Sequence, residues 1–317
     1  MLAVYAAALN DADPLAGLRV GDRPEADAPP GWEIVEVRAA ALNHHDLWSL
    51  RGVGLDEHRL PMILGTDAAG IAADGRPVVA HAVIPEDGRW SLPSERHQGT
   101  LAERVALPAP NLVDKPPELS FEEAACLPTA YLTAYRMLFV RGGLRPGQRV
   151  LIQGAGGGVA TAAVQLAAAG GLEVTVTSRS EEGLEYARSL GAHHLLRSGE
   201  RVPERVDVVL ETVGEATWAH SLRALRDGGR IVVAGATSGP NPPADLRRVF
   251  IREVEVLGSS MGTREELDWL IRFLRVSGVR PLIDSVHALA DAPSAFRRLQ
   301  GGEAKGKVVV RVGERSA

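Results

Sequence analysis

Two adjacent histidines and an aspartate interrupt an otherwise apolar stretch near the N-terminus. The stretch is ALNHHDLWSLRG, residues 41–52, and its polar centre is Asn43, His44, His45 and Asp46. Imidazole and carboxylate groups bind metals, and histidine also exchanges protons near neutral pH. We interpret the stretch as extended, with neighbouring side chains on opposite faces, so one ion does not easily take both imidazoles. Additional ligands would have to come from scattered positions, namely His81, His97 and Asp67.

A glycine cluster in VLIQGAGGGVATAAVQLA forms a second candidate site. It lies between an apolar run and a small-residue pattern typical of a buried helix, and consists of Gly154, Gly156, Gly157 and Gly158. Such a turn lets the backbone approach a ligand closely and points the N–H groups of the helix start at an anion. Ala160 stands where a third glycine is common and is small enough for close packing. The cluster predicts a dinucleotide pyrophosphate site, with a purely structural turn as the alternative.

The strand after this helix distinguishes between two dinucleotides. It runs from Val174 to Thr177 and is followed by Ser178, Arg179 and Ser180, with no acid at its tip. NAD binding usually needs a carboxylate there for the ribose 2′-OH, whereas a guanidinium suits the 2′-phosphate of NADP. The sequence therefore predicts NADP(H), preferred over NAD(H). The alternative is that Arg179 is a solvated residue at the start of the next helix.

Short strands and helices alternate from about residue 148 onward. The predicted strands are 149–153, 173–177, 206–210, 229–235 and 254–258, and the predicted helices are 159–169, 181–190, 216–225 and 264–277. This alternation predicts a doubly wound parallel sheet of the α/β class. Residues 1–125 are rich in proline and glycine with short β-branched runs, which predicts compact β structure. The closing β run, residues 306–312, could return to that part and complete it.

The bulk composition limits the classes of function. The chain has 317 residues, of which 45% are hydrophobic and 24% charged, and its formal net charge is -5. Length and composition predict two soluble domains. The net negative charge gives no indication of a basic surface that would bind nucleic acid or an anionic membrane. One cysteine, Cys126, cannot form an internal disulfide, and no uncharged apolar run reaches about 18 residues. We expect a cytoplasmic protein with a small-molecule substrate.

In their order and spacing, several stretches resemble the medium-chain dehydrogenase/reductase superfamily. They include ALNHHDLWSLRG, LPMILGTDAAG, EEAACLPTAYLTAYRML, RPGQRVLIQGAGGGVATAAVQLA, VDVVLETVG and the closing GKVVVRV. The resemblance covers nearly the whole chain. It implies a GroES-like β-rich catalytic domain over 1–125 and 261–317, and a Rossmann NAD(P)-binding domain over 126–260.

The same resemblance separates zinc-dependent from zinc-free members. Cysteine, histidine and cysteine or aspartate hold the catalytic zinc in three motifs, whose positions correspond here to Asn43, Thr66 and Thr129. None of these is a good zinc ligand. The region where a structural zinc loop would lie, residues 80–99, contains no cysteine. We therefore expect no metal.

The resemblance also implies roles for individual residues. The catalytic candidates are Asn43, His45, Thr66 and Thr129, with His45 at a proton-relay position beside the nicotinamide and Asp46 as a structural acid. The further cofactor candidates are His44 near the pyrophosphate, Thr133 against the nicotinamide, Val159, Val213, Gly235, Ala236, Ser259 and Ser260. For both histidines, a satisfied side chain without a catalytic role is the alternative.

Without a metal, hydride transfer needs an acceptor that is already electron-poor. Quinones and activated enones or enoyl thioesters meet this condition, whereas a simple alcohol normally needs zinc to acidify its proton. We expect a zinc-free, NADPH-dependent reductase of the quinone oxidoreductase-like branch that forms a homodimer. The alternatives are a zinc alcohol dehydrogenase with substitute ligands and a non-catalytic, crystallin-like nucleotide-binding protein.

Overall fold

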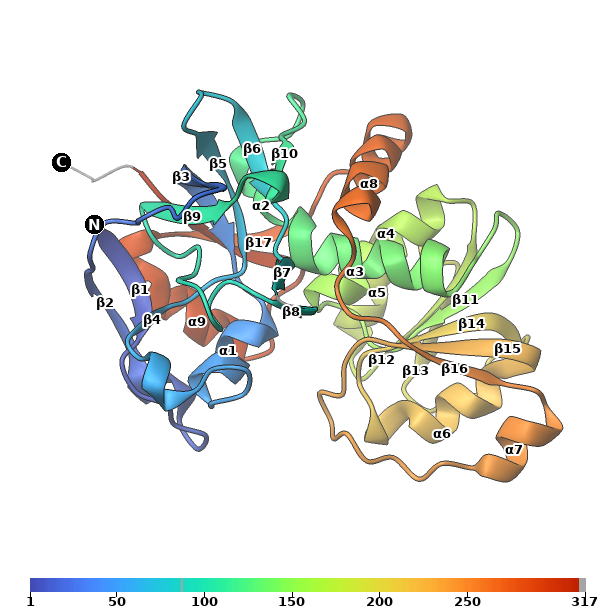
Figure 1. Cartoon of the computed structure of the whole chain (residues 1–317). Helices are drawn as coiled ribbons and strands as arrows, with labels where there is room; N and C mark the ends of the chain where they lie inside the picture. The colour runs from blue at the N-terminus through green and yellow to red at the C-terminus, as the bar shows by residue number, and fades with distance from the viewer. Residues whose placement is uncertain (87, 314–317) are drawn as a thin grey trace. The chain divides into compact units, whose positions relative to one another are not determined.

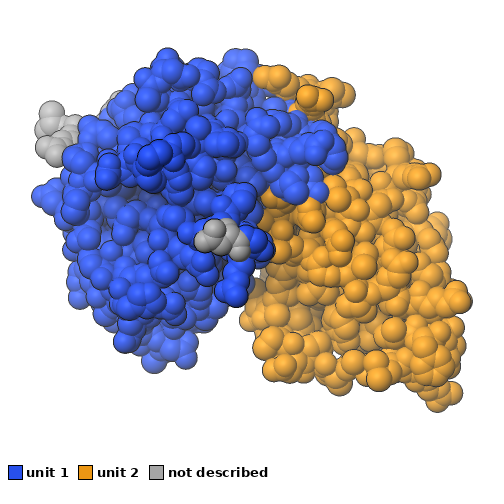
Figure 2. All heavy atoms as spheres, in the orientation of Figure 1, with its two compact units in different colours: residues 1–130, 263–271, 280–317 blue, residues 131–262, 272–279 orange. Residues whose placement is uncertain are grey.

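The computed structural model describes residues 1–86 and 88–313, which form two compact units (Figure 2). The first unit contains Met1–Ala130, Thr263–Ile271 and Arg280–Ala317, and the second contains Tyr131–Gly262 and Arg272–Val279. The boundaries expected from the sequence lie at 125/126 and 260/261. Residues 314–317 of the expected range 261–317 lie outside the described part of the chain.

A seven-stranded sheet forms the centre of the first unit, with strand order β10-β6-β5-β3-β18-β17 and with β9 paired to β3. Its strands are β3 (Trp32–Ala41), β5 (Asp67–Ala72), β6 (Pro77–Ala80), β9 (Arg104–Pro108), β10 (Leu112–Asp114), β17 (Ile283–Ala288) and β18 (Lys307–Arg311). The closing strand β18 runs antiparallel to β3, with Val309 opposite Ala41. The expected return of the C-terminal β run to the N-terminal part is therefore confirmed.

Smaller elements complete the first unit. The other strands are β1 (Leu2–Ala6), β2 (Leu18–Asp22) and β4 (Met62–Ile63) in one sheet, and β7 (Ile84–Glu86) with β8 (Arg89–Ser91) in a hairpin. The helices are α1 (His44–Leu50), α2 (Phe121–Ala125) and α9 (Ala292–Gln300), with 3-10 turns at Pro14–Gly17, Glu57–Arg59, Ala109–Asn111 and Leu289–Asp291. Side chains from the sheets and from α1 and α9 form one apolar core, in which Leu50 and Phe296 are fully buried.

The second unit contains a six-stranded parallel sheet with strand order β13-β12-β11-β14-β15-β16. The strands are β11 (Arg149–Ile152), β12 (Glu173–Ser178), β13 (His194–Arg197), β14 (Val206–Glu211), β15 (Leu225–Val233) and β16 (Glu255–Gly258). Figure 1 shows α4 (Gly158–Ala169) and α5 (Glu181–Ser189) on one face and α6 (Glu215–Ala224) on the other. Covering both faces explains why the strands β11, β12 and β14 are almost entirely buried. The predicted doubly wound parallel sheet is confirmed.

The remaining helices are α3 (Leu132–Tyr135), α7 (Leu246–Ile251) and α8 (Arg264–Ser277), with π-helical turns at Leu127–Tyr131 and Arg136–Arg141. Strand β13 and helix α7 were not expected from the sequence. Within residues 1–86 and 88–313, every helix is too short or too polar to cross a membrane.

Candidate active site

The histidine pair lies on a helix rather than on an extended segment. Helix α1 starts at His44, and its preceding residue Asn43 has extended backbone angles (φ -130°, ψ 159°). The backbone N–H of Asn43 donates to the carboxylate of Asp46 at 2.8 Å, and the N–H of Gly65 donates to the same group at 3.0 Å. The extended interpretation was wrong, because this helix-capping contact outweighs the strand-like pattern. Neighbouring helical side chains diverge by about 100°, so His44, which is exposed, and His45 still do not converge.

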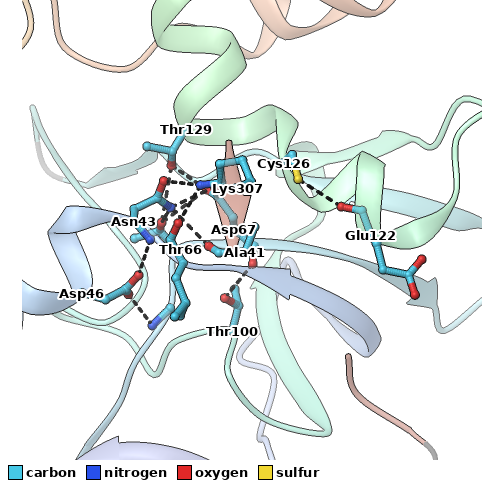
Figure 3. Close-up of polar contacts among 12 residues, drawn as sticks. Ala41, Asn43, Asp46, Thr66, Asp67, Thr100, Glu122, Cys126, Thr129 and Lys307 are labelled. Atoms are coloured by element: carbon cyan, nitrogen blue, oxygen red, sulfur yellow. Dashed lines mark hydrogen bonds and ion pairs between the residues drawn. The ribbon is translucent and has the colours of Figure 1, made fainter. Parts of the chain in front are cut away.

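Four polar residues meet around the buried carboxylate of Asp67, and we call the five residues together the Asp67 cluster: Asn43, Thr66, Asp67, Thr129 and Lys307 (Figure 3). Asp67 is fully buried. Its Oδ2 accepts from the amide nitrogen of Asn43 at 3.0 Å, and its Oδ1 accepts from the hydroxyls of Thr129 at 2.5 Å and Thr66 at 3.3 Å. All five residues belong to the first unit. Three predicted catalytic residues are thus brought together, and their hydrogen bonds converge on Asp67.

Lys307 is the cation of the Asp67 cluster. Strand β18 lies beside β3, and the N–H of Leu42 donates to the carbonyl of Val308 at 2.9 Å, so the side chain of Lys307 enters from the sheet. Its Nζ donates to the carbonyl of Leu42 at 2.7 Å and to Oδ1 of Asn43 at 2.6 Å. The same atom lies 3.6 Å from Oδ2 of Asp67. We had not predicted a role for this lysine.

The donor set of the Asp67 cluster does not fit a zinc ion. The amide nitrogen of Asn43 lies 3.1 Å from the hydroxyl of Thr66, which lies 3.4 Å from that of Thr129, so the positions corresponding to the ligands do converge. They offer neutral amide and hydroxyl groups instead of thiolate or imidazole. The thiol of Cys126 donates to the carbonyl of Glu122 at 3.2 Å, and burial raises the pKa of this thiol to about 12, which opposes thiolate formation. Over the described residues, no group of three His, Cys, Asp or Glu side chains is arranged to hold a metal.

His45 contacts a carboxylate that the sequence did not indicate. Its Nε2 lies 2.9 Å from Oε1 of Glu95, and its Nδ1 lies 3.5 Å from the hydroxyl of Ser49. Burial lowers the pKa of His45, but the hydrogen bond to Glu95 and the negative charges of Asp46 and other nearby carboxylates outweigh it, so the net pKa is raised. The second oxygen of Glu95 accepts from the backbone N–H of Leu92 at 3.1 Å. A raised pKa increases the fraction of imidazolium that can donate a proton near neutral pH.

The glycine cluster has the backbone that an anion site requires. Gly154 and Gly156 have φ values of 84° and 113°, in the region that favours glycine, and helix α4 begins at Gly158. The N–H of Gly154 donates to the hydroxyl of Thr177 at 3.2 Å, which joins the turn to the end of β12. A methyl group at Gly157 would meet no atom within 4 Å. The turn therefore has open space at the start of a twelve-residue helix, where a phosphate is favoured.

Two arginines, rather than one, lie near the tip of β12. Ser178 is buried and Arg179 is exposed, and Ser178 is the register partner of Arg197 at the end of β13. The guanidinium of Arg197 donates to the carbonyl of Arg179 at 3.2 Å and to Glu181 at 2.5 Å. Sequence reasoning missed Arg197, because the only signal was its position in a strand that was not predicted.

The loop after β14 is held by a buried carboxylate. Glu211 is fully buried and accepts from the N–H groups of Val213 at 2.8 Å and Gly214 at 3.0 Å. The hydroxyls of Thr217 and Ser221 donate to the same carboxylate. This network fixes the backbone of Val213 at the carboxyl end of a parallel strand, where open sheets bind their ligands.

The other predicted cofactor residues belong to the second unit, apart from His44. Gly235 and Ala236 are half-buried after β15, and a methyl group at Gly235 would lie 3.0 Å from the carbonyl of Thr212. Ser259 has a buried hydroxyl that makes no hydrogen bond to any residue of 1–86 or 88–313, whereas Ser260 is exposed. Thr133 is buried in α3, and Val159 is half-buried in the first turn of α4. The unpartnered hydroxyl of Ser259 is available to a ligand.

Comparison with known proteins agrees with this fold. Residues 158–275 match the family model described as zinc-binding dehydrogenase. The chain is 30% identical to a zinc-type alcohol dehydrogenase-like protein of Schizosaccharomyces pombe, over 89% of this chain and 91% of that protein. It is also 30% identical to the quinone oxidoreductase of Lama guanicoe, over 87% of this chain and 88% of that protein.

A solved structure extends the comparison to three dimensions. The 2-octenoyl-CoA carboxylase reductase CinF, in complex with NADP and 2-octenoyl-CoA, superposes with a TM-score of 0.90 at 25% identity. The match covers 99% of this chain and 88% of that one. The expected α/β fold, with a Rossmann-like parallel sheet and a separate GroES-like β-rich domain, is confirmed.

Proposed function

Because the chain belongs to the medium-chain dehydrogenase/reductase superfamily and is therefore an NAD(P)H-dependent oxidoreductase, we propose that it reduces activated acceptors with NADPH and without zinc. One observation carries this proposal. The resemblance implies that Asn43, Thr66 and Thr129 stand where zinc-dependent members carry their zinc ligands, and in this chain their side chains make hydrogen bonds to Asp67.

The chemistry of the Asp67 cluster favours an acceptor that needs no Lewis acid. NADPH, when bound, supplies the hydride. A quinone, an enone or an enoyl thioester has an electron-poor carbon that takes hydride directly, and the new negative charge then needs a proton. His45 is the proposed proton donor, because its contact with Glu95 raises its pKa. Two of the similar proteins, the quinone oxidoreductase of Lama guanicoe and the 2-octenoyl-CoA carboxylase reductase CinF, are named for substrates of these types.

NADPH is the proposed cofactor in preference to NADH. The tip of β12 carries Arg179 and no acid, and Arg197 at the end of β13 adds a second guanidinium nearby. A guanidinium favours a 2′-phosphate, which bears about two negative charges at pH 7, and Arg179 is the one of the two that is not paired with Glu181. The complex of CinF with NADP supports the same choice.

A homodimer is the proposed assembly, and the cytoplasm the proposed compartment. Strand β16 is the last strand of the parallel sheet, and Val256 on it is 47% exposed. An apolar sheet edge is a ready template for pairing with a second copy. Cys126 is a free, buried thiol, which suits a reducing compartment.

The test measures metal content and substrate range on the same protein. We expect purified protein to contain far less than one zinc per chain and to oxidise NADPH with quinones, enones or enoyl thioesters. Treatment with a chelator should leave this activity unchanged. A panel of simple alcohols with NADP⁺ serves as the comparison and should give little turnover.

Two results would contradict the proposal. Stoichiometric zinc, with alcohol oxidation lost to the chelator, would make the chain a zinc alcohol dehydrogenase with unusual ligands. Tight NADPH binding without turnover on any acceptor class would make it a non-catalytic nucleotide-binding protein.

A further inference from the structure

Lys307 is buried to an extent that is rare for lysine. Only 3% of its side chain is exposed, and it is the first residue of β18, which lies between β3 and β17 in the sheet. Moving an ammonium group out of water is costly unless hydrogen bonds and an opposite charge compensate for it. The compensation here comes from two carbonyl-type oxygens, of Leu42 and Asn43, and from the carboxylate of Asp67 at 3.6 Å.

The contacts of Lys307 also orient the amide of Asn43. The ammonium group can only donate, so the amide oxygen of Asn43 faces Lys307. The amide nitrogen then faces Asp67 and Thr66, at 3.0 and 3.1 Å. Removing the positive charge would therefore leave a buried carboxylate uncompensated and release an amide that could turn.

We propose that the ammonium group of Lys307 is the internal cation of this site, where it neutralises Asp67, fixes Asn43 and excludes a divalent metal ion. Lys307 is thus a positioning residue. This assignment rests on the proposed function in one respect, namely that the site holds no zinc. It identifies Lys307 as the group that supplies, in this site, the positive charge that a metal ion would otherwise supply.

Without Lys307, the Asp67 cluster would have the composition of a site for a hard cation. The oxygen donors that remain are the carboxylate of Asp67, the amide of Asn43, the hydroxyls of Thr66 and Thr129, and the carbonyl of Leu42. Carboxylate, carbonyl and hydroxyl oxygens are the ligands of Mn²⁺ and similar ions. A positive charge 3.6 Å from the one carboxylate opposes a second cation at the same place.

The experiment is a titration of the full-length protein with Mn²⁺, followed by electron paramagnetic resonance and by thermal unfolding. We expect Lys307→Met to bind one Mn²⁺ per chain at least about tenfold more tightly than the wild type. Added Mn²⁺ should raise the melting temperature of this variant and leave that of the wild type unchanged. Lys307→Arg keeps the charge and should behave like the wild type.

A second variant allows the proposal to be tested even if Lys307→Met does not fold. Lys307→Gln keeps hydrogen-bond donors for Leu42 and Asn43 but removes the charge, so it should also gain Mn²⁺ binding. The double variant Lys307→Met/Asp67→Asn lacks both charges and should bind none. If the folded Lys307→Gln protein binds Mn²⁺ no better than the wild type, or if Lys307→Arg gains the same affinity, the assignment is overturned.

The outcomes for Lys307 and for the proposed function are separable. The Mn²⁺ titration needs neither NADPH nor an acceptor, so it can fail while wild-type turnover persists. Zinc at the Asp67 cluster of the wild type would overturn both, whereas an inactive wild type without metal would overturn only the proposed function.

Discussion

Arg179 is the residue on which the choice of cofactor depends most directly. It is exposed at the tip of β12, and no described side chain forms an ion pair with it. We expect Arg179→Ala to weaken NADPH binding about tenfold or more, because a charge-assisted hydrogen bond to the 2′-phosphate would be lost. NADH carries a hydroxyl at that position, so its affinity should change little. Fluorescence titration with each nucleotide measures both effects.

A matched arginine on the same unit provides the control for this prediction. Arg188 is 63% exposed in the last turn of α5, where it pairs with Glu185. Arg188→Ala removes the same charge away from the strand tip and should leave both affinities unchanged. Equal losses of NADPH and NADH binding in Arg179→Ala would remove this residue from the proposed phosphate site.

At the residue level, the resemblance to a known family could locate the candidate catalytic residues in the sequence, but it could not identify the side chains that they contact. The convergence of Asn43, Thr66 and Thr129 follows from matching motifs, and it is present in the structure. Lys307 and Glu95 could not be predicted, because each meets its partner through the register of distant segments. Lys307 lies 264 positions from Asn43 in sequence, and only the pairing of β18 with β3 brings them together.

In the turn between β11 and α4, alanine substitutions at two neighbouring glycines should distinguish the effect of backbone strain on stability from the effect of a blocked ligand site on NADPH binding. Gly156 has a φ of 113°, which a residue with a side chain adopts only at a cost, whereas Gly157 has a φ of -62°. We expect Gly156→Ala to lower the free energy of unfolding by about 1 kcal/mol or more. Gly157→Ala should leave stability nearly unchanged and weaken NADPH binding, because its methyl group would enter the open space beside the helix start.

Urea unfolding and nucleotide titration of both glycine variants test this prediction. The two variants add the same methyl group to neighbouring positions, so each is the control for the other. Undiminished NADPH binding by Gly157→Ala would show that the pyrophosphate lies elsewhere. A fully stable Gly156→Ala protein would contradict the strain expected at this φ.

At the element level, periodicity predicted the long alternating segments and failed for short ones. Apart from β13, the strands and helices from β11 to α6 lie close to their expected positions, because each strand is a mostly buried run and each helix follows it at the expected spacing. Helix α1 was missed, although Asn43 followed three residues later by Asp46 is itself a signal for a helix start. Strand β13 was missed because it is only four residues long and half-buried.

At the scale of the whole molecule, the division of the chain into units is only partly visible in the sequence. The change in composition near residue 148 marks the parallel sheet, but nothing in the pattern of residues 264–277 indicates that Arg272–Val279 belongs to the second unit. Within each unit, the order of the strands depends on long-range pairing. The return of β18 to β3 could be suspected from an apolar closing run, but its register could not.

The proposed homodimer depends on strand β16, which ends the parallel sheet. Its residues Val256 and Leu257 are not fully buried, and Phe250 and Ile251 in the adjoining helix α7 are 70% and 59% exposed. An edge strand, which pairs with β15 on one side only in the described sheet and is flanked by exposed apolar side chains, favours pairing with its own copy about a two-fold axis. We expect Val256→Lys to convert the dimer to a monomer in sedimentation velocity, because a charge on the edge opposes pairing.

The control for this prediction is an apolar residue that is even more exposed. Val276 on α8 is 91% exposed, and Val276→Lys adds the same charge away from the sheet edge, so the dimer should persist. A wild-type protein that sediments as a monomer at micromolar concentration would exclude the proposed assembly. A dimer that survives Val256→Lys but not Val276→Lys would instead place the interface on α8. Because the Asp67 cluster lies in the first unit and β16 in the second, the Mn²⁺ response of Lys307→Met should be independent of the state of assembly.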